Sequence, residues 1–147
     1  MTKKSKPIVW LLFIVYCVVL IKMILFKMPF SQIDDAIRAI SVGRIADNLK
    51  LANFIPFKHI LVYMDAYFKV AMKNLGMGIL LFIPLGYFLP ALTKHRQFKN
   101  VIVVGLLTSI SFETLQLLLS LGVFDIDDII LNGIGVVLGF MIYKSFR

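Results

Sequence analysis

Glu113 is the acidic residue in the middle of the long apolar stretch 101–121. A charged side chain at bilayer depth costs at least ~2.5 kcal/mol on insertion scales, so it faces protein or water and usually serves function. Small and polar residues recur at spacings of three or four, which places them on one line of a helix. This line consists of Gly105, Ser109, Glu113, Gln116 and Ser120. It predicts an inward-facing site in which Glu113 is a candidate acid or base.

A second line follows near the end of the chain, again at spacings of three and four. It consists of Asp125, Asp128, Asn132, Gly135 and Gly139. Few residues separate the two predicted helices, so they should pack antiparallel and bring both lines together. We expect the carboxylates to share one pocket there, with Glu113 and Asp128 as the candidate catalytic groups.

Simpler roles are open for the same residues. Asp125, Asp127 and Asp128 sit where a helix begins, and acids there accept hydrogen bonds from free backbone N–H groups. For Asp127 such capping, or plain solvation, is the favoured interpretation. A protonated Glu113 bonded to Gln116 or to a neighbouring helix would serve only assembly.

A metal site is a minor alternative. Glu113, Asp125 and Asp128 are hard oxygen donors suited to Ca²⁺ or Mg²⁺. The sequence has no spaced metal-binding loop, and His59 and His95 stand isolated along the chain. We therefore expect neither a metal nor a cofactor.

The elements that carry these residues are predicted to be membrane helices. With 60% hydrophobic residues among 147, the chain has more apolar surface than a soluble core of this size buries. The predicted fold is an all-α, polytopic membrane protein with a single domain over residues 1–147. Its four transmembrane helices are expected at residues 7–26, 75–92, 101–121 and 129–143, the last of them short of the ~20 residues that span a bilayer.

Residues 27–73 form a predicted outer segment between the first and second transmembrane helices. One surface helix is expected to start near Ser31 and stop at Gly43. A second, interfacial helix is expected over residues 60–70. Because Pro56 forbids a continuous helix between them, the chain there is expected to be interfacial or re-entrant.

The basic residues predict the orientation. If the chain crosses the membrane four times, the basic residues that flank the helices in short segments all lie on the same side of the membrane. They are Lys3, Lys4, Lys6, Lys94, Arg96, Lys99, Lys144 and Arg147. By the positive-inside rule, both termini are cytoplasmic. The net charge of +8 is thereby explained by membrane anchoring, and we expect no nucleic-acid partner.

Four groups of residues resemble the VanZ-like family of membrane proteins. They are Asn53-Phe54-Ile55-Pro56-Phe57; Asn74 with Leu80-Leu81-Phe82-Ile83-Pro84-Leu85-Gly86 and Leu89-Pro90; Ser111, Glu113 and Gln116; and Phe124-Asp125-Ile126-Asp127-Asp128 with Asn132 and Gly135. The resemblance covers residues 51–140. One departure is Met77-Gly78, which stands where the family pattern has Gly-Asn, so that an amide of the pocket is missing.

The resemblance implies a bacterial envelope protein linked to lowered sensitivity to glycopeptide antibiotics such as teicoplanin, without a known reaction. The Lys, Ile and Phe-rich composition fits a Gram-positive source. The expected partners are membrane lipids, a lipid-linked cell-wall precursor or the lipoglycopeptide itself, with a homodimer through Gly135 and Gly139. The ligand pocket would then consist of Asn53, Pro56, Phe57, Asn74, Glu113, Gln116, Asp125, Asp128 and Asn132.

Three functions follow from these residues. The leading interpretation is a non-enzymatic protein whose outward acidic pocket binds cationic or hydrogen-bonding groups, while Phe54, Phe57 and Tyr63 cover apolar parts. The second is a membrane-embedded enzyme on a lipid-linked envelope substrate, with Glu113 and Asp128 as acid/base groups or metal ligands. The third is a small ion-coupled carrier in which Glu113 titrates.

Overall fold

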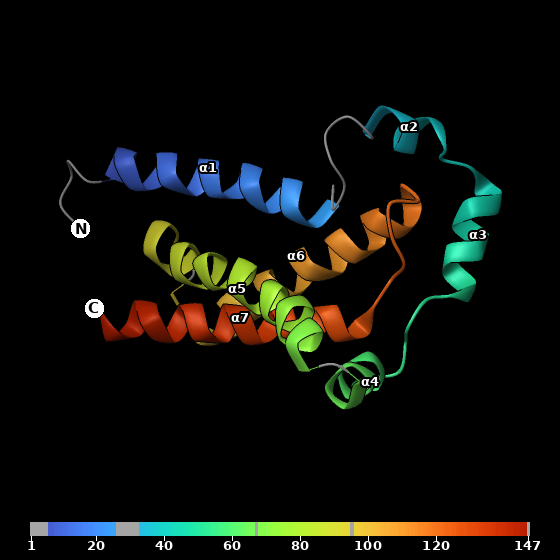
Figure 1. Cartoon of the computed structure of the whole chain (residues 1–147). Helices are drawn as coiled ribbons and strands as arrows, with labels where there is room; N and C mark the ends of the chain where they lie inside the picture. The colour runs from blue at the N-terminus through green and yellow to red at the C-terminus, as the bar shows by residue number, and fades with distance from the viewer. Residues whose placement is uncertain (1–5, 26–32, 67, 95, 147) are drawn as a thin grey trace.

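The chain is all-helical in the part that the structure describes, as predicted. A computed structural model describes residues 6–25, 33–66, 68–94 and 96–146, which form seven helices and no strand (Figure 1). The helices are α1 (Lys6–Leu25), α2 (Ile33–Arg38), α3 (Val42–Lys50), α4 (Lys58–Ala66), α5 (Phe68–Leu92), α6 (Phe98–Leu118) and α7 (Ile126–Ser145).

The long helices form a membrane bundle. Within the described residues, α1 from Pro7, α6 and α7 are long and apolar enough to cross a bilayer, and α5 contains the shorter apolar stretch Gly76–Leu92. About four membrane helices is therefore consistent with the prediction. Figure 1 shows that α1 begins and α7 ends at the same end of this bundle, whereas α2, α3 and α4 gather at the other end.

The third and fourth predicted membrane helices differ from the structure in their bounds. The fourth has 20 residues instead of 15 and ends at Ser145. Its start is three residues earlier than predicted, because Asp125 caps α7 by accepting a hydrogen bond from the backbone nitrogen of Asp127 over 2.9 Å. Asp127 and Asp128 thus lie in the first turn of α7, and its length suffices for a bilayer. The third helix ends at Leu118 instead of residue 121, since Ser120 has a φ of 54° and the backbone oxygen of Gln116 closes the turn.

The outer segment was predicted only in part. The expected stop at Gly43 is wrong: α2 already ends at Arg38, and Gly43 lies in the first turn of α3. The reason is Ser41, whose side chain accepts a hydrogen bond from the backbone nitrogen of Arg44 over 3.2 Å and so begins a new helix. The expected start at Ser31 lies outside the described residues.

The second outer helix also differs from its prediction over residues 60–70. It is α4, which starts two residues earlier and ends at Ala66, whereas the residues from Phe68 onward belong to α5. As a result α5 is seven residues longer at its start than the predicted second span, 25 residues in all, with Pro84 and Pro90 inside it. The chain around Pro56 is non-helical, as expected.

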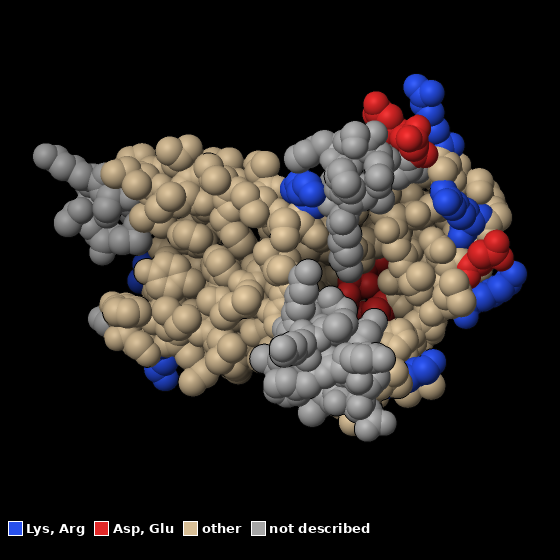
Figure 2. Space-filling view, in the orientation of Figure 1, with Lys and Arg blue, Asp and Glu red and all other residues tan. Residues whose placement is uncertain are grey.

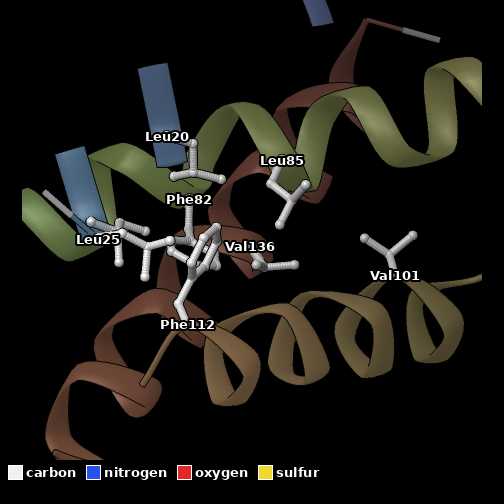
Figure 3. Close-up of a cluster of buried hydrophobic side chains, with 8 residues drawn as sticks. Leu20, Leu25, Phe82, Leu85, Val101, Phe112 and Val136 are labelled. Carbon is white, nitrogen blue, oxygen red and sulfur yellow. The ribbon is translucent and has the colours of Figure 1, made fainter. Parts of the chain in front are cut away.

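The bundle has one apolar core to which all four long helices contribute (Figure 3). Its buried side chains are Leu20, Ile24 and Leu25 of α1, Phe82 and Leu85 of α5, Val101 and Phe112 of α6, and Val136 of α7. The outward faces are apolar too, with Leu11 and Leu12 of α1 and Leu107 of α6 exposed. Apolar residues on both sides of a helix are expected where one side faces lipid.

Glycines allow α5 and α7 to approach closely. A Cβ atom at Gly135 would overlap the backbone oxygen of Ile79, and one at Gly139 would overlap that of Ile83. Gly86 of α5 lies in the same way against the backbone of α7. The close contact that the Gly-x-x-x-Gly pattern predicts is therefore made within one chain, and the face on which we expected a second copy is covered by α5.

Candidate functional site

Two segments far apart in sequence meet at the end of the bundle that carries α2, α3 and α4. The backbone nitrogen of Asn53 donates to the oxygen of Phe124 over 2.8 Å, and the nitrogen of Ile126 donates to the oxygen of Asn53 over 3.0 Å. This parallel bridge fixes the loop before α4 against the turn between α6 and α7. The rings of Phe54 and Phe124 stack beside it, with centroids 5.3 Å apart.

Glu113 connects α6 to the same place. Its side chain is 2% exposed, and Oε2 accepts a hydrogen bond of 2.9 Å from the backbone nitrogen of Asp125. Four members of the line that the sequence predicted to face inward do so, since Gly105, Ser109 and Gln116 are buried with Glu113. The fifth, Ser120, lies beyond the end of α6 with a φ of 54° and does not continue the helical line. Figure 2 shows acidic side chains set deep in the surface, in contrast to others that project from it.

Asp125 lies at the centre of a polar network. One carboxylate oxygen, Oδ1, accepts from Nδ2 of Asn53 over 2.8 Å and from the backbone nitrogen of Asp127 over 2.9 Å. The other, Oδ2, lies 2.6 Å from Nδ1 of His59. The sequence suggested that His59 is isolated, but the structure places it beside the Asp125 carboxylate. A carboxylate on one ring nitrogen orients an imidazole and favours the tautomer whose lone pair is on Nε2.

Asp127 binds several backbone N–H groups of the segment before and at the start of α4. It is 1% exposed, and its carboxylate accepts hydrogen bonds from the backbone nitrogens of Phe57, of His59 (2.8 Å) and of Ile60 (3.2 Å). These N–H groups belong to the start of α4. The interpretation of Asp127 as solvated, or as a cap of its own helix, is wrong because it caps a different helix. Phe57, which precedes α4, has no side-chain acceptor and a φ of 67°.

Two amides of the predicted pocket are bonded elsewhere. Gln116 donates from Nε2 to the backbone oxygen of Ile24 over 2.7 Å, which joins α6 to the end of α1. Asn132 donates from Nδ2 to the hydroxyl oxygen of Ser109 over 2.8 Å. A Cβ atom at Gly78 would lie 2.8 Å from Oδ1 of Asn132, so the missing side chain at this position leaves room for the Asn132 amide.

The other predicted residues are less central. Pro56 and Phe57 are exposed, and Phe57 joins the network only through its backbone. Asp128 is partly buried in the first turn of α7. The backbone of Asn74 is part of α5, but its side chain and all of His95 lie outside what the structure describes. The structure thus joins Asn53, Glu113 and Asp125, and adds Asp127 and His59, which sequence spacing did not indicate.

The interactions that the structure shows at this site are hydrogen bonds. Within the described part of the chain, no three Asp, Glu, His or Cys side chains are grouped so that they could hold a metal ion. The carboxylates of Asp125 and Asp127 bind the chain's own N–H groups and so position residues 53–60. The Asp125–His59 pair adds an oriented imidazole that is 37% exposed.

The comparisons with known proteins identify a family but no close relative. A family model described as VanZ/LLP1 matches residues 13–147, nearly the whole chain. No curated protein and no solved structure matches it.

Proposed function

Because the chain belongs to the VanZ/LLP1 family, we propose that it acts in the bacterial cell envelope and lowers sensitivity to glycopeptide antibiotics such as teicoplanin. The family match and the membrane helices support a multi-pass protein of the plasma membrane. In this proposal the start of α1 and the end of α7 face the cytoplasm, because the basic residues Lys94, Arg96 and Lys144 lie on the flanks at that end. The Glu113 site then faces outward.

The observation that supports a binding role is the convergence on Glu113. A buried carboxylate inside a membrane helix is costly, yet here it is bonded to the start of α7, and the segment 53–60 is bonded to that same start. In our proposal this site binds a cationic or hydrogen-bonding group of a lipid-linked envelope component, or of the lipoglycopeptide. Glu113 and Asp128 are the ligand-binding acids, whereas Asp125 and Asp127 hold the site together.

The test is antibiotic susceptibility of a Gram-positive host that expresses the wild type, Glu113→Gln or Asp128→Asn. A glutamine retains an oxygen for the N–H of Asp125, so Glu113→Gln should keep membrane abundance while it removes the carboxyl group. Asp47→Asn is the matched control, because Asp47 is an exposed carboxylate on α3 at the same end. We expect protection against teicoplanin from wild type and Asp47→Asn only. Full protection from both pocket variants at equal abundance contradicts the proposal.

The His59–Asp125 pair favours a second candidate, an enzyme acting on a lipid-linked envelope substrate. An imidazole oriented by a carboxylate is a common general base, and a side chain of this kind is accessible here. His59 would accept a proton from water or from a substrate hydroxyl.

The two candidates are separable by one substitution. His59→Gln keeps a polar side chain but cannot relay a proton. The enzyme candidate predicts that purified protein changes the mass of a component in a lipid extract of the host envelope, and that His59→Gln stops this change while binding persists. An unchanged extract with wild-type protein rules the enzyme out and leaves the binding role.

A further inference from the structure

An apolar surface lies outside the membrane helices, in the segment that joins the outer part of the chain to α4. Its members are large side chains between 52% and 64% exposed, namely Phe54, Ile55, Phe57, Leu61 and Val62. We call these residues the 54–62 surface. Soluble proteins rarely expose large contiguous apolar patches, and such patches usually mark contact with a partner or with a membrane.

The 54–62 surface is fixed at the level where α7 begins. Asp127, in the first turn of α7, binds three backbone nitrogens of this segment, and Asn53 bridges to Asp125. Figure 1 shows α4 beside the start of α7. Since α7 is a candidate membrane span, its start marks the boundary of the bilayer at this end. The exposed apolar side chains therefore lie at the depth of the lipid interface.

Backbone N–H groups of the segment are hydrogen-bonded to protein, which suits a region with little water. The nitrogens of Phe57, His59 and Ile60 donate to Asp127, and those of Lys58 and Leu61 donate to backbone oxygens within the segment. The nitrogen of Ile55 donates to the side chain of Asn53 over 3.2 Å, and Pro56 has no N–H. Non-helical backbone is tolerated at membrane depth where protein satisfies its polar groups, and these bonds satisfy the N–H groups of residue 55 and of residues 57–61.

The charge of the segment suits a lipid headgroup layer. Residues 54–62 contain no acidic residue, and the exposed Lys58 lies between Phe57 and the apolar residues of α4. A basic side chain among aromatic and aliphatic ones is typical of segments that lie in the membrane interface, where the ammonium group meets lipid phosphates.

We propose that the 54–62 surface inserts into the headgroup and upper acyl region of the leaflet at the start of α7, with Lys58 among the lipid phosphates. The hydrogen bonds that Asp127 accepts from this segment hold the surface at that depth in the bilayer. The partner is the lipid bilayer itself, and the inference does not depend on an antibiotic or enzymatic role.

The test uses the full-length protein in vesicles of phosphatidylcholine and phosphatidylglycerol, with and without bromine on the upper acyl carbons of the phosphatidylcholine. The native Trp10, which is exposed on α1, serves as the reference for a tryptophan in contact with lipid. It is then replaced by Phe, and one tryptophan is introduced by Ile55→Trp or by Leu61→Trp. The matched control is Asp47→Trp, at an exposed polar position of α3.

We expect the fluorescence of Ile55→Trp and Leu61→Trp to be lost in brominated vesicles to about the extent seen for Trp10, with a blue-shifted emission. The Asp47→Trp control should instead be quenched by aqueous acrylamide and show little effect of bromine. Quenching at positions 55 and 61 by acrylamide alone overturns the proposal. So does protection from both quenchers, because the side chains then lie against protein, such as a second copy of the chain.

Discussion

The backbone nitrogen of His59 donates a hydrogen bond of 2.8 Å to Oδ2 of Asp127, although 68 positions separate these residues. The same carboxylate receives the N–H groups of Phe57 and Ile60, so α4 begins where α7 begins. Asp127 thus does for α4 what a capping side chain usually does for its own helix. The two helix starts form one structural unit, and Glu113 is bonded to it through Asp125.

Replacing Asp127 with alanine should detach the start of α4. The change removes the acceptor of three N–H groups at a buried position, and we expect a loss of about 2 kcal/mol in the free energy of unfolding. Trypsin should then cleave faster at Lys58. Asp47→Ala is the control, because its exposed pair with Lys50 should contribute well under ~1 kcal/mol. Equal protease resistance of the two variants in detergent argues against the capping role.

Replacing Gly139 with alanine should weaken the contact between α5 and α7. The added methyl group overlaps the backbone oxygen of Ile83, and backbone yields less easily than a side chain end. We expect the free energy of unfolding to fall by about 3 kcal/mol, which is the upper end of the range for an overpacked core. At Gly76, where nothing lies within 4 Å of an added Cβ atom, alanine should be neutral or stabilising. Thermal unfolding in detergent compares the two; similar midpoints for both variants contradict the packing shown here.

The Asn132–Ser109 hydrogen bond joins α7 to α6 inside the bundle over 2.8 Å. Double-mutant cycles give hydrogen bonds between membrane helices a coupling free energy of roughly 0.6 kcal/mol on average and at most about 1.7 kcal/mol. Because this one is buried, we expect a coupling energy of about 1 kcal/mol between Ser109→Ala and Asn132→Ala. A double-mutant cycle of unfolding free energies measures it, and strictly additive effects refute it.

Gly78 should matter only because of Asn132. An alanine at position 78 brings a methyl group against Oδ1 of Asn132, so we expect the amide to shift away from Ser109. The free energy of unfolding should then fall by about 1 kcal/mol. In the Asn132→Ala background the same change should be neutral or stabilising, since alanine favours a helix over glycine. Destabilisation of similar size in both backgrounds assigns the effect to another contact.

Helix position and facing direction were largely readable from sequence. Apolar length predicts α1, α6 and α7, and the spacing of Ser109, Glu113 and Gln116 predicts that their common face is buried, as it is. The capping of α7 by the acids at its start was readable only in part, and the cap at Ser41 was missed, because the same residue types also occur in plain loops. The start of α5 was missed, since it follows α4 closely and its first residues are not strongly apolar.

By itself the sequence determined the all-helical class, the membrane character and the inward face of α6, because hydrophobicity and helical period are local properties of the chain. Only the tertiary structure decided that His59 pairs with Asp125, that Asp127 caps α4 and that Gly139 contacts α5. These contacts join residues far apart along the chain. Their formation depends on how the helices are placed in space, and the spacing of residues along a single helix carries no information about that placement.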